Sequence, residues 1–183
     1  MKLKDRKVIL ITGPAGSGKT SLAERIAQNE NWIHVSEDLH WVEIKKGHSA
    51  GEGRTPKEQR IVQPAVVHQI RDLFSKENNV VLEFINYENP PNPLIFYYEE
   101  LLKDSNQIFV AVLRPNESVI MERKKKRGRA NDQDYEKELK NARHQLACLE
   151  SIYIREEWAI DSSDMTVEEI YAKYILAFVE ENA

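Results

Sequence analysis

The sequence predicts a three-layer α/β fold with a mainly parallel central sheet. Short apolar runs typical of buried strands alternate along the 183 residues with segments that carry apolar residues at helical spacing. A glycine-rich turn follows the first of these runs. Regular alternation of strands and helices is typical of a parallel sheet of about five strands with helices on both faces. We therefore expect a single domain over residues 1–183.

Composition and charge narrow the possible functions. The chain has 30 Asp and Glu residues and 26 Lys and Arg residues, which gives a net charge of −4. This negative charge argues against a general nucleic-acid binder. The single cysteine, Cys148, excludes an internal disulfide, and we expect it to be a small core residue. No apolar run approaches the roughly 20 residues that a bilayer span needs. We expect a cytoplasmic protein without membrane contact, as a monomer or homodimer.

The first strand, Val8–Ile11, leads into Gly13-Pro-Ala-Gly-Ser-Gly-Lys-Thr20, which fits G-x-x-x-x-G-K-[ST] at every position. Glycines allow such a loop to curl around an anion so that its N–H groups point inward. A chance glycine turn is the alternative. It is disfavoured because the motif requires a strand before it and a helix after it, and the sequence predicts both.

We therefore expect this loop to hold the phosphates of a nucleotide. Lys19 would contact the β- and γ-phosphates, and the Thr20 hydroxyl would bind Mg²⁺. The expected nucleotide-binding residues of the loop and first helical turn are Gly13, Ala15, Gly16, Ser17, Gly18, Lys19, Thr20 and Ser21.

The second strand, Trp32–Val35, ends at Ser36-Glu37-Asp38. In an open parallel sheet, ligands bind at the carboxyl ends of the strands, so these acids are candidates for the same crevice as the glycine-rich loop. Helix capping is the alternative. Capping or solvation is favoured for Glu37, whereas both interpretations stay open for Asp38.

Residues from about 40 to 78 form an expected helical insertion that covers a substrate. A helix over Leu39–Lys46 is followed by the small polar loop Gly47–Gly53, which we expect to be mobile. A capping box at Thr55–Glu58 then begins a second helix, in which Pro64 predicts a kink or a restart.

The third strand, Val80–Ile85, is apolar except for Glu83. A carboxylate in a buried strand needs a partner. An ion pair with a nearby Lys or Arg is one possibility. We favour a site for Mg²⁺ or its bound water beside the glycine-rich loop.

The fourth strand, Ile108–Leu113, precedes a helix that runs into Glu122-Arg-Lys-Lys-Lys-Arg-Gly-Arg129. We expect a solvated helix face to account for some of the cations at 124–126. Arg123 and Arg127 lie four residues apart, so both can grip phosphate oxygens from one face. A basic RNA-binding strip is a third interpretation, weakened because no aromatic residues are interleaved with it. We expect a basic lid over about 122–134.

The remaining chain completes the α/β pattern. One helix is expected over 134–157, with an apolar stripe that serves packing and forms no site. A short fifth strand, Trp158–Ile160, follows, and a capping box at Thr166–Glu169 begins the last helix.

The whole pattern resembles the P-loop kinases of small molecules, such as shikimate, gluconate and adenylate kinases. Beyond the loop motif, four stretches are similar to segments of that family: Glu37-Asp38-Leu39-His40, Val81-Leu-Glu-Phe-Ile-Asn86, Arg123–Arg129, and Ile160-Asp-Ser-Ser-Asp-Met-Thr-Val-Glu-Glu169. The chain departs from the family in carrying Glu83 where Asp is usual. The glycine triplet of shikimate kinases after the third strand is also absent.

The resemblance implies the sheet order 2-3-1-4-5 of a P-loop NTPase fold. It implies that Asp38 orients or deprotonates an acceptor hydroxyl, and that Arg123 and Arg127 close over ATP. Residues Ser162 to Asp164 would lie near adenine. Candidate substrate contacts are His40, Arg54 and Arg60.

The expected function is therefore ATP- and Mg²⁺-dependent transfer of a phosphoryl group to a hydroxyl, or a phosphate, of a small metabolite. The catalytic residues would be Lys19, Asp38, Arg123 and Arg127. Two alternatives remain: a P-loop ATPase or nucleotide-dependent switch that binds a protein partner, and a nucleic-acid end kinase.

Overall fold

A five-stranded parallel sheet forms the centre of the computed structural model, which describes residues 6–44, 55–105, 107–129 and 132–181. Its strands are β1 (Lys7–Thr12), β2 (Trp32–Ser36), β3 (Asn79–Phe84), β4 (Gln107–Leu113) and β5 (Ala159–Ile160). They are arranged in the order β2-β3-β1-β4-β5, and every pairing is parallel. The predicted fold class and the order 2-3-1-4-5 are confirmed.

β1 lies at the middle of the sheet and is buried along its whole length. Because successive side chains of a strand point to opposite faces, β1 supplies both halves of the core. Val8 and Leu10 belong to one core cluster, and Ile9 and Ile11 belong to the other.

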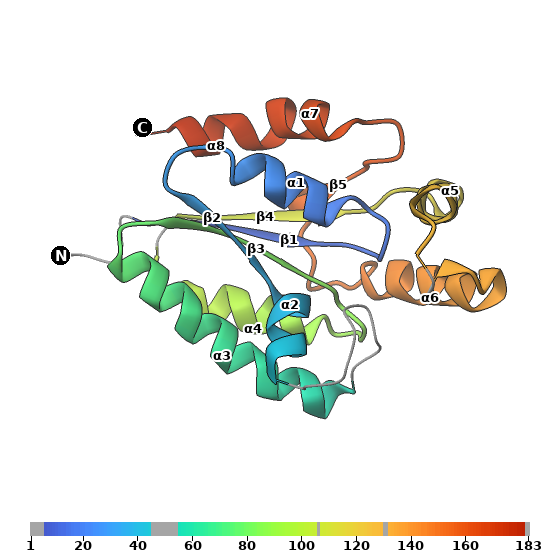
Figure 1. The fold of residues 1–183 in the computed structure, drawn as a ribbon, viewed down its shortest axis with the longest axis horizontal. Helices are drawn as coiled ribbons and strands as arrows, with labels where there is room; N and C mark the ends of the chain where they lie inside the picture. The colour runs from blue at the N-terminus through green and yellow to red at the C-terminus, as the bar shows by residue number, and fades with distance from the viewer. Residues whose placement is uncertain (1–5, 45–54, 106, 130–131, 182–183) are drawn as a thin grey trace.

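Helices cover both faces of this sheet (Figure 1). On one face lie α1 (Lys19–Ile26), α7 (Val167–Ile170) and α8 (Leu176–Glu180), the last two joined by a π-helical turn. On the other face lie α2 (Glu37–Ile44), α3 (Pro56–Ser75) and α4 (Asn92–Leu101). Both predicted capping boxes are present, with the Thr55 and Thr166 side chains accepting hydrogen bonds from the backbone N–H groups of Glu58 and Glu169.

The expected restart at Pro64 is wrong, since α3 runs unbroken from Pro56 to Ser75. Pro64 lies on the exposed side of this helix, where water can bond the carbonyl that the proline leaves without a donor. On the opposite side, buried Val62, Val66 and Ile70 hold the helix against the sheet. Burial of this stripe outweighs the local cost of the proline.

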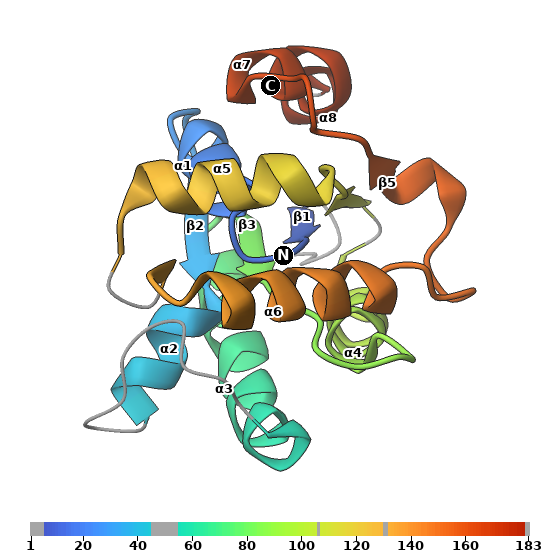
Figure 2. The ribbon, with the colours of Figure 1, turned by 90° about the vertical axis from the view of Figure 1, so that its right-hand side faces the viewer.

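Two further helices lie beyond the carboxyl ends of the strands, side by side in Figure 2. They are α5 (Glu117–Arg127) and α6 (Tyr135–Cys148), which share a small core of Ile120, Met121 and Ala142. The prediction of one helix over 134–157 is wrong in its extent. The chain leaves α6 at Leu149 because it must turn back to add β5 beside β4, and Ile152 in this turn is 93% exposed.

Within the described ranges, no helix combines the length and the apolar character needed to cross a membrane.

Candidate functional site

The loop between β1 and α1 has the backbone that its glycines predict. Gly16 and Gly18 have φ angles of 92° and 99°, in the left-handed region that side chains with a Cβ disfavour. A Cβ on Gly13 would lie 2.6 Å from the Leu113 carbonyl oxygen of β4, so this glycine permits close packing. The Ser17 hydroxyl is buried, and no partner for it is found among the described residues. The left-handed glycines thus shape the loop, and the Ser17 hydroxyl in it is available to bond a ligand.

Lys19 folds back onto this loop. Its Nζ donates hydrogen bonds to the carbonyl oxygens of Gly13 at 3.0 Å and Pro14 at 2.9 Å, and only 7% of the residue is exposed. Burial lowers the pKa of Lys19 to about 8, although the nearby Glu83 carboxylate acts in the opposite direction. The two hydrogen-bond partners of Lys19 are uncharged carbonyl oxygens, so an anion in the loop would give this ammonium group a charged partner.

Glu83 lies beside the loop, on the strand next to β1. Its Oε2 accepts a hydrogen bond from Thr20 Oγ1 at 2.8 Å, and its Oε1 lies 3.2 Å from Nε2 of His34. Burial by itself would raise the pKa of Glu83, but the bond to His34, the Lys19 charge and the Thr20 hydroxyl together lower it. Glu83 is therefore an ionised carboxylate held by two side chains.

His34 is part of this network and was not predicted. The sequence feature that could have predicted this role is a polar residue in β2, because β2 pairs with β3, the strand that carries Glu83.

The residues around Thr20 suit magnesium better than a metal with an all-protein ligand set. In the described part of the chain, no group of three or more His, Cys, Asp or Glu side chains is placed to hold a metal. Mg²⁺ is usually held by one or two carboxylates together with phosphate oxygens and waters. A hydroxyl and a carboxylate beside a phosphate-binding loop fit that preference.

A cavity of about 1140 Å³ opens over the loop. The loop and α1 form its floor, with Lys19, Thr20 and Ser21 among the lining residues. Asp38 from α2 and Glu83 from β3 also line it. The acid after β2 and the phosphate-binding motif therefore share one open cavity.

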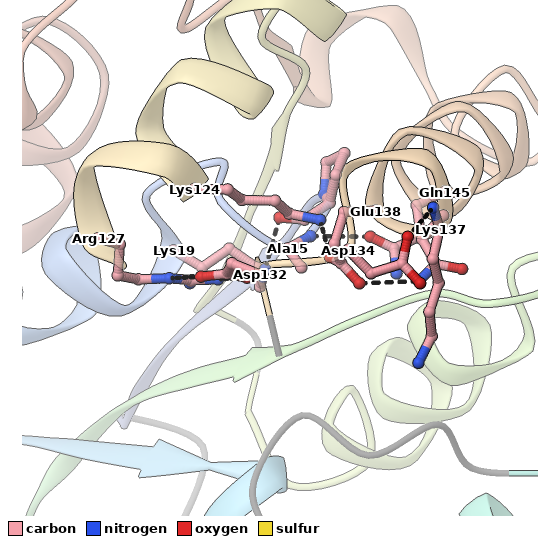
Figure 3. Close-up of polar contacts among 11 residues, drawn as sticks. Ala15, Lys19, Lys124, Arg127, Asp132, Asp134, Lys137, Glu138 and Gln145 are labelled. Carbon is pink, nitrogen blue, oxygen red and sulfur yellow. Dashed lines mark hydrogen bonds and ion pairs between the residues drawn. The ribbon is translucent and has the colours of Figure 1, made fainter. Parts of the chain in front are cut away.

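Arg123 and Arg127 both line this cavity, and each already has a partner. Arg123 donates to the Ser17 carbonyl oxygen at 3.2 Å and to that of Ser162 at 2.8 Å, which ties α5 to the loop. Arg127 makes two hydrogen bonds to Asp132, at 2.9 and 2.7 Å (Figure 3). Arg123 thus braces the loop, whereas Arg127 is held at the cavity by a carboxylate.

Of the three cations at 124–126, Lys125 and Lys126 are exposed as a solvated face requires, whereas Lys124 is not part of such a face. Its side chain is 1% exposed, and its Nζ donates to Glu138 Oε2 of α6 at 2.6 Å. Its stem packs so closely on the loop that a Cβ at Gly16 would lie 3.2 Å from Lys124 Cγ. The buried cation is possible because α6 supplies its counter-ion, a contact that the local sequence does not reveal.

α6 is a wall of the cavity, so the expectation that it serves packing alone is wrong. Glu138, Asn141 and Gln145, three and four residues apart, all line the cavity. Gln145 Oε1 accepts a hydrogen bond from the Ala15 backbone N–H at 2.8 Å (Figure 3). The signal for this role was a polar stripe beside the apolar one on the same helix.

Other candidate residues lie elsewhere. Glu37 is fully buried and accepts a hydrogen bond from the Tyr97 hydroxyl at 2.7 Å, so it is not solvated. His40 and Arg60 are not among the residues that line the cavity. Arg54 and the Gly47–Gly53 loop fall outside the described residues.

The segment expected near adenine contributes to the cavity through different residues. Ser162 is buried and Asp164 is exposed, and neither lines the cavity. The lining residues of this region are Met165, Thr166, Val167 and Ile170.

Comparisons with known proteins agree with this fold. A family model described as AAA domain matches residues 8–152. No curated protein sequence matches the chain.

Three solved structures illustrate the similarity. The chain resembles a gluconokinase from Sinorhizobium meliloti 1021, with 19% identity, a TM-score of 0.66, and coverage of 97% of this chain and 94% of that one. It resembles a shikimate kinase from Acinetobacter baumannii in complex with shikimate, with 17% identity, a TM-score of 0.60, and coverage of 98% and 96%. A chain of the Pnkp1/Rnl/Hen1 RNA repair complex is similar at 18% identity and a TM-score of 0.57, over 76% of this chain and 45% of that one. This chain thus spans less than half the length of that relative.

The lowered pKa of Lys19 predicts a pH dependence of stability. The pKa is about 8 in the folded protein and 10.5 at its usual value, so the unfolded chain binds more protons between these limits. Stability should therefore rise with pH across this window, by at most roughly 1.4 kcal/mol per pH unit. Urea denaturation of the nucleotide-free protein, compared with Lys19→Met, measures it. Parallel pH profiles of the two proteins would contradict the assignment.

The buried Lys124–Glu138 pair predicts a non-additive pair of substitutions. Glu138→Leu leaves the Lys124 charge buried without its partner and should cost about 3–5 kcal/mol of stability. The double variant Lys124→Met/Glu138→Leu should recover most of this loss, because no buried charge remains. Glu117→Leu, which breaks the exposed ion pair with Arg143, is the control and should cost less than about 1 kcal/mol. A double variant no more stable than Glu138→Leu would refute the interpretation.

Proposed function

The chain belongs to the AAA domain family, and from this premise we propose that it is an ATP-dependent phosphotransferase acting on a small metabolite. The observation that carries the proposal is the shared cavity. It contains a phosphate-binding loop, an ionised carboxylate beside the loop, and the separate carboxylate of Asp38. The similarity in fold to a gluconokinase and a shikimate kinase supports it.

In this proposal the loop holds the β- and γ-phosphates. The backbone N–H groups between Gly13 and Thr20 donate to phosphate oxygens, and Lys19 leaves the two carbonyl groups it now contacts to pair with the charge. Pairing with phosphate would restore the pKa of Lys19 towards its usual range. The loop would thus gain both hydrogen bonds and charge neutralisation.

Thr20 and Glu83 would hold Mg²⁺, which neutralises phosphate charge during transfer. His34 would position Glu83, since it contacts the carboxylate oxygen that Thr20 does not.

Asp38 would orient the acceptor hydroxyl or take its proton. It lies at the start of α2 and lines the same cavity as Lys19. A carboxylate that accepts the hydroxyl hydrogen places the oxygen for attack on phosphorus. In this role Asp38 has no need to contact the nucleotide.

Arg127 would stabilise the charge that develops on the transferred group. Its guanidinium group is already at the cavity, held there by Asp132. Arg123 would act indirectly, by holding the backbone of the loop at Ser17.

A second candidate is a kinase of nucleic-acid ends. It is favoured by the similarity to a chain of an RNA repair complex and by the exposed cations Lys125, Lys126 and Arg129, of which Arg129 lines the cavity. The net charge of −4 counts against it. The two candidates differ in acceptor, so oligonucleotides and small hydroxyl compounds belong in the same assay.

Asp38→Asn tests the proposed mechanism. Phosphoryl transfer to an acceptor should fall by about 10²-fold or more, because an amide is a much weaker base than a carboxylate. The affinity for ATP should stay within about twofold. Transfer from γ-labelled ATP and calorimetric titration with ATP measure the two quantities.

Asp72→Asn removes an exposed carboxylate of α3 and is the matched control. Unchanged turnover in Asp38→Asn would end the assignment of Asp38. ATP hydrolysis that no acceptor accelerates, in the wild-type protein, would favour a nucleotide-dependent switch in place of a kinase.

A further inference from the structure

The phosphate-binding loop makes a hydrogen bond that a phosphate would have to replace. The Ala15 N–H, in the middle of the loop, donates to Gln145 Oε1 of α6 at 2.8 Å. Gln145 is 7% exposed, so its carbonyl group has little access to water. Figure 3 shows Gln145 and Ala15 meeting directly.

α6 is fastened so that Gln145 stays at the loop. Seven residues before Gln145, Glu138 forms the buried ion pair with Lys124 of α5. Next to Gln145, His144 Nε2 lies 2.8 Å from the Tyr87 carbonyl oxygen in the loop after β3. Contacts on both sides therefore fix the helix across the cavity.

A backbone N–H carries a single hydrogen, so Ala15 cannot make full bonds to Gln145 and to a phosphate together. Lys19 repeats this pattern, since its ammonium group is taken up by the Gly13 and Pro14 carbonyl oxygens. These two donors of the loop, the Ala15 N–H and the Lys19 ammonium group, are satisfied internally by oxygens that carry no charge. A phosphate would bind these donors more strongly, because charged acceptors form stronger hydrogen bonds.

We propose that Gln145 is an internal competitor of the nucleotide: it occupies the Ala15 N–H in the nucleotide-free protein, and phosphate binding displaces it and removes one of the contacts that hold its end of α6. This inference rests on the proposed function in that the loop must bind ATP. The buried Lys124–Glu138 pair keeps the other end of α6 in place. Nucleotide binding would therefore be sensed by the cavity wall that carries Asn141, His144 and Gln145.

Two substitutions that keep the side chain similar in size test whether Gln145 competes with ATP for the Ala15 N–H or instead helps to bind ATP. Gln145→Met removes the competing acceptor and should tighten ATP binding roughly fivefold, the factor that corresponds to one net neutral hydrogen bond. Gln145→Glu supplies a charged acceptor that holds the Ala15 N–H more strongly and repels phosphate, so it should weaken ATP binding more than tenfold. Calorimetric titration with ATP gives both dissociation constants.

Gln133→Met and Gln133→Glu are matched controls. Gln133 is exposed and is not among the cavity-lining residues, so Gln133→Glu reports the effect of an added charge alone and Gln133→Met the effect of losing an amide. Both should bind ATP within about twofold of the wild-type protein. Thermal unfolding confirms that every variant is folded before titration.

Amide hydrogen exchange gives a readout independent of affinity. In the wild-type protein, ATP should increase exchange in the segment 141–148, and Gln145→Met should show this increase before ATP is added.

The outcomes distinguish the inference from the function on which it rests. If neither the wild-type protein nor Gln145→Met binds ATP, the proposed function fails and the inference fails with it. If all proteins bind ATP equally, the inference alone is overturned. Weaker binding by Gln145→Met also overturns it, because Gln145 would then assist the nucleotide.

Discussion

The parallel pairing of β1 with β3 is the constraint on which the site depends. It aligns Ile11 with Glu83, one residue before the end of β1. The loop that follows β1 and the carboxylate near the end of β3 must then meet at one edge of the sheet, where Thr20 and Glu83 share a hydrogen bond. The burial of β1 on both faces holds this register. A shift of one residue would turn its apolar side chains to the wrong layers and point Glu83 away from Thr20.

The rest of the cavity depends on contacts between charged or polar groups of α5, α6 and the loop. Arg123 binds loop backbone, Lys124 pairs with Glu138, and Gln145 accepts from Ala15. These groups satisfy one another in the absence of an anion. Apart from the buried Lys124, these groups line the space that a nucleotide would enter, so binding has to exchange internal partners for phosphate oxygens. The affinity for nucleotide would then be a difference between two sets of hydrogen bonds.

The local sequence was sufficient to predict most of the helices and strands and the glycine-rich loop after β1. The glycine spacing, the apolar runs and the two capping boxes each depend on neighbouring residues, and the corresponding loop, strands and helix starts are present. The burial of Lys124 and the role of Gln145 were missed because their partners, Glu138 and Ala15, are 14 and 130 residues away. The charged run on α5 predicts a solvated helix face, and the burial of Lys124 becomes evident only when the position of α6 is known. For His40 and Arg60, no local pattern in the sequence fixed a position relative to the loop, and neither residue lines the cavity.

The central claim is that one cavity binds a nucleotide and a phosphate acceptor together. A thermal-shift screen with a non-hydrolysable ATP analogue and a panel of hydroxyl-bearing metabolites tests it most directly, because a ligand stabilises the folded state according to the ratio of its concentration to Kd. The account predicts that the analogue raises Tm and that one class of metabolite raises it further only when the analogue is present. Gly16→Val, which strains a backbone at φ 92°, should abolish both shifts. A Tm that saturating analogue leaves unchanged would contradict the account.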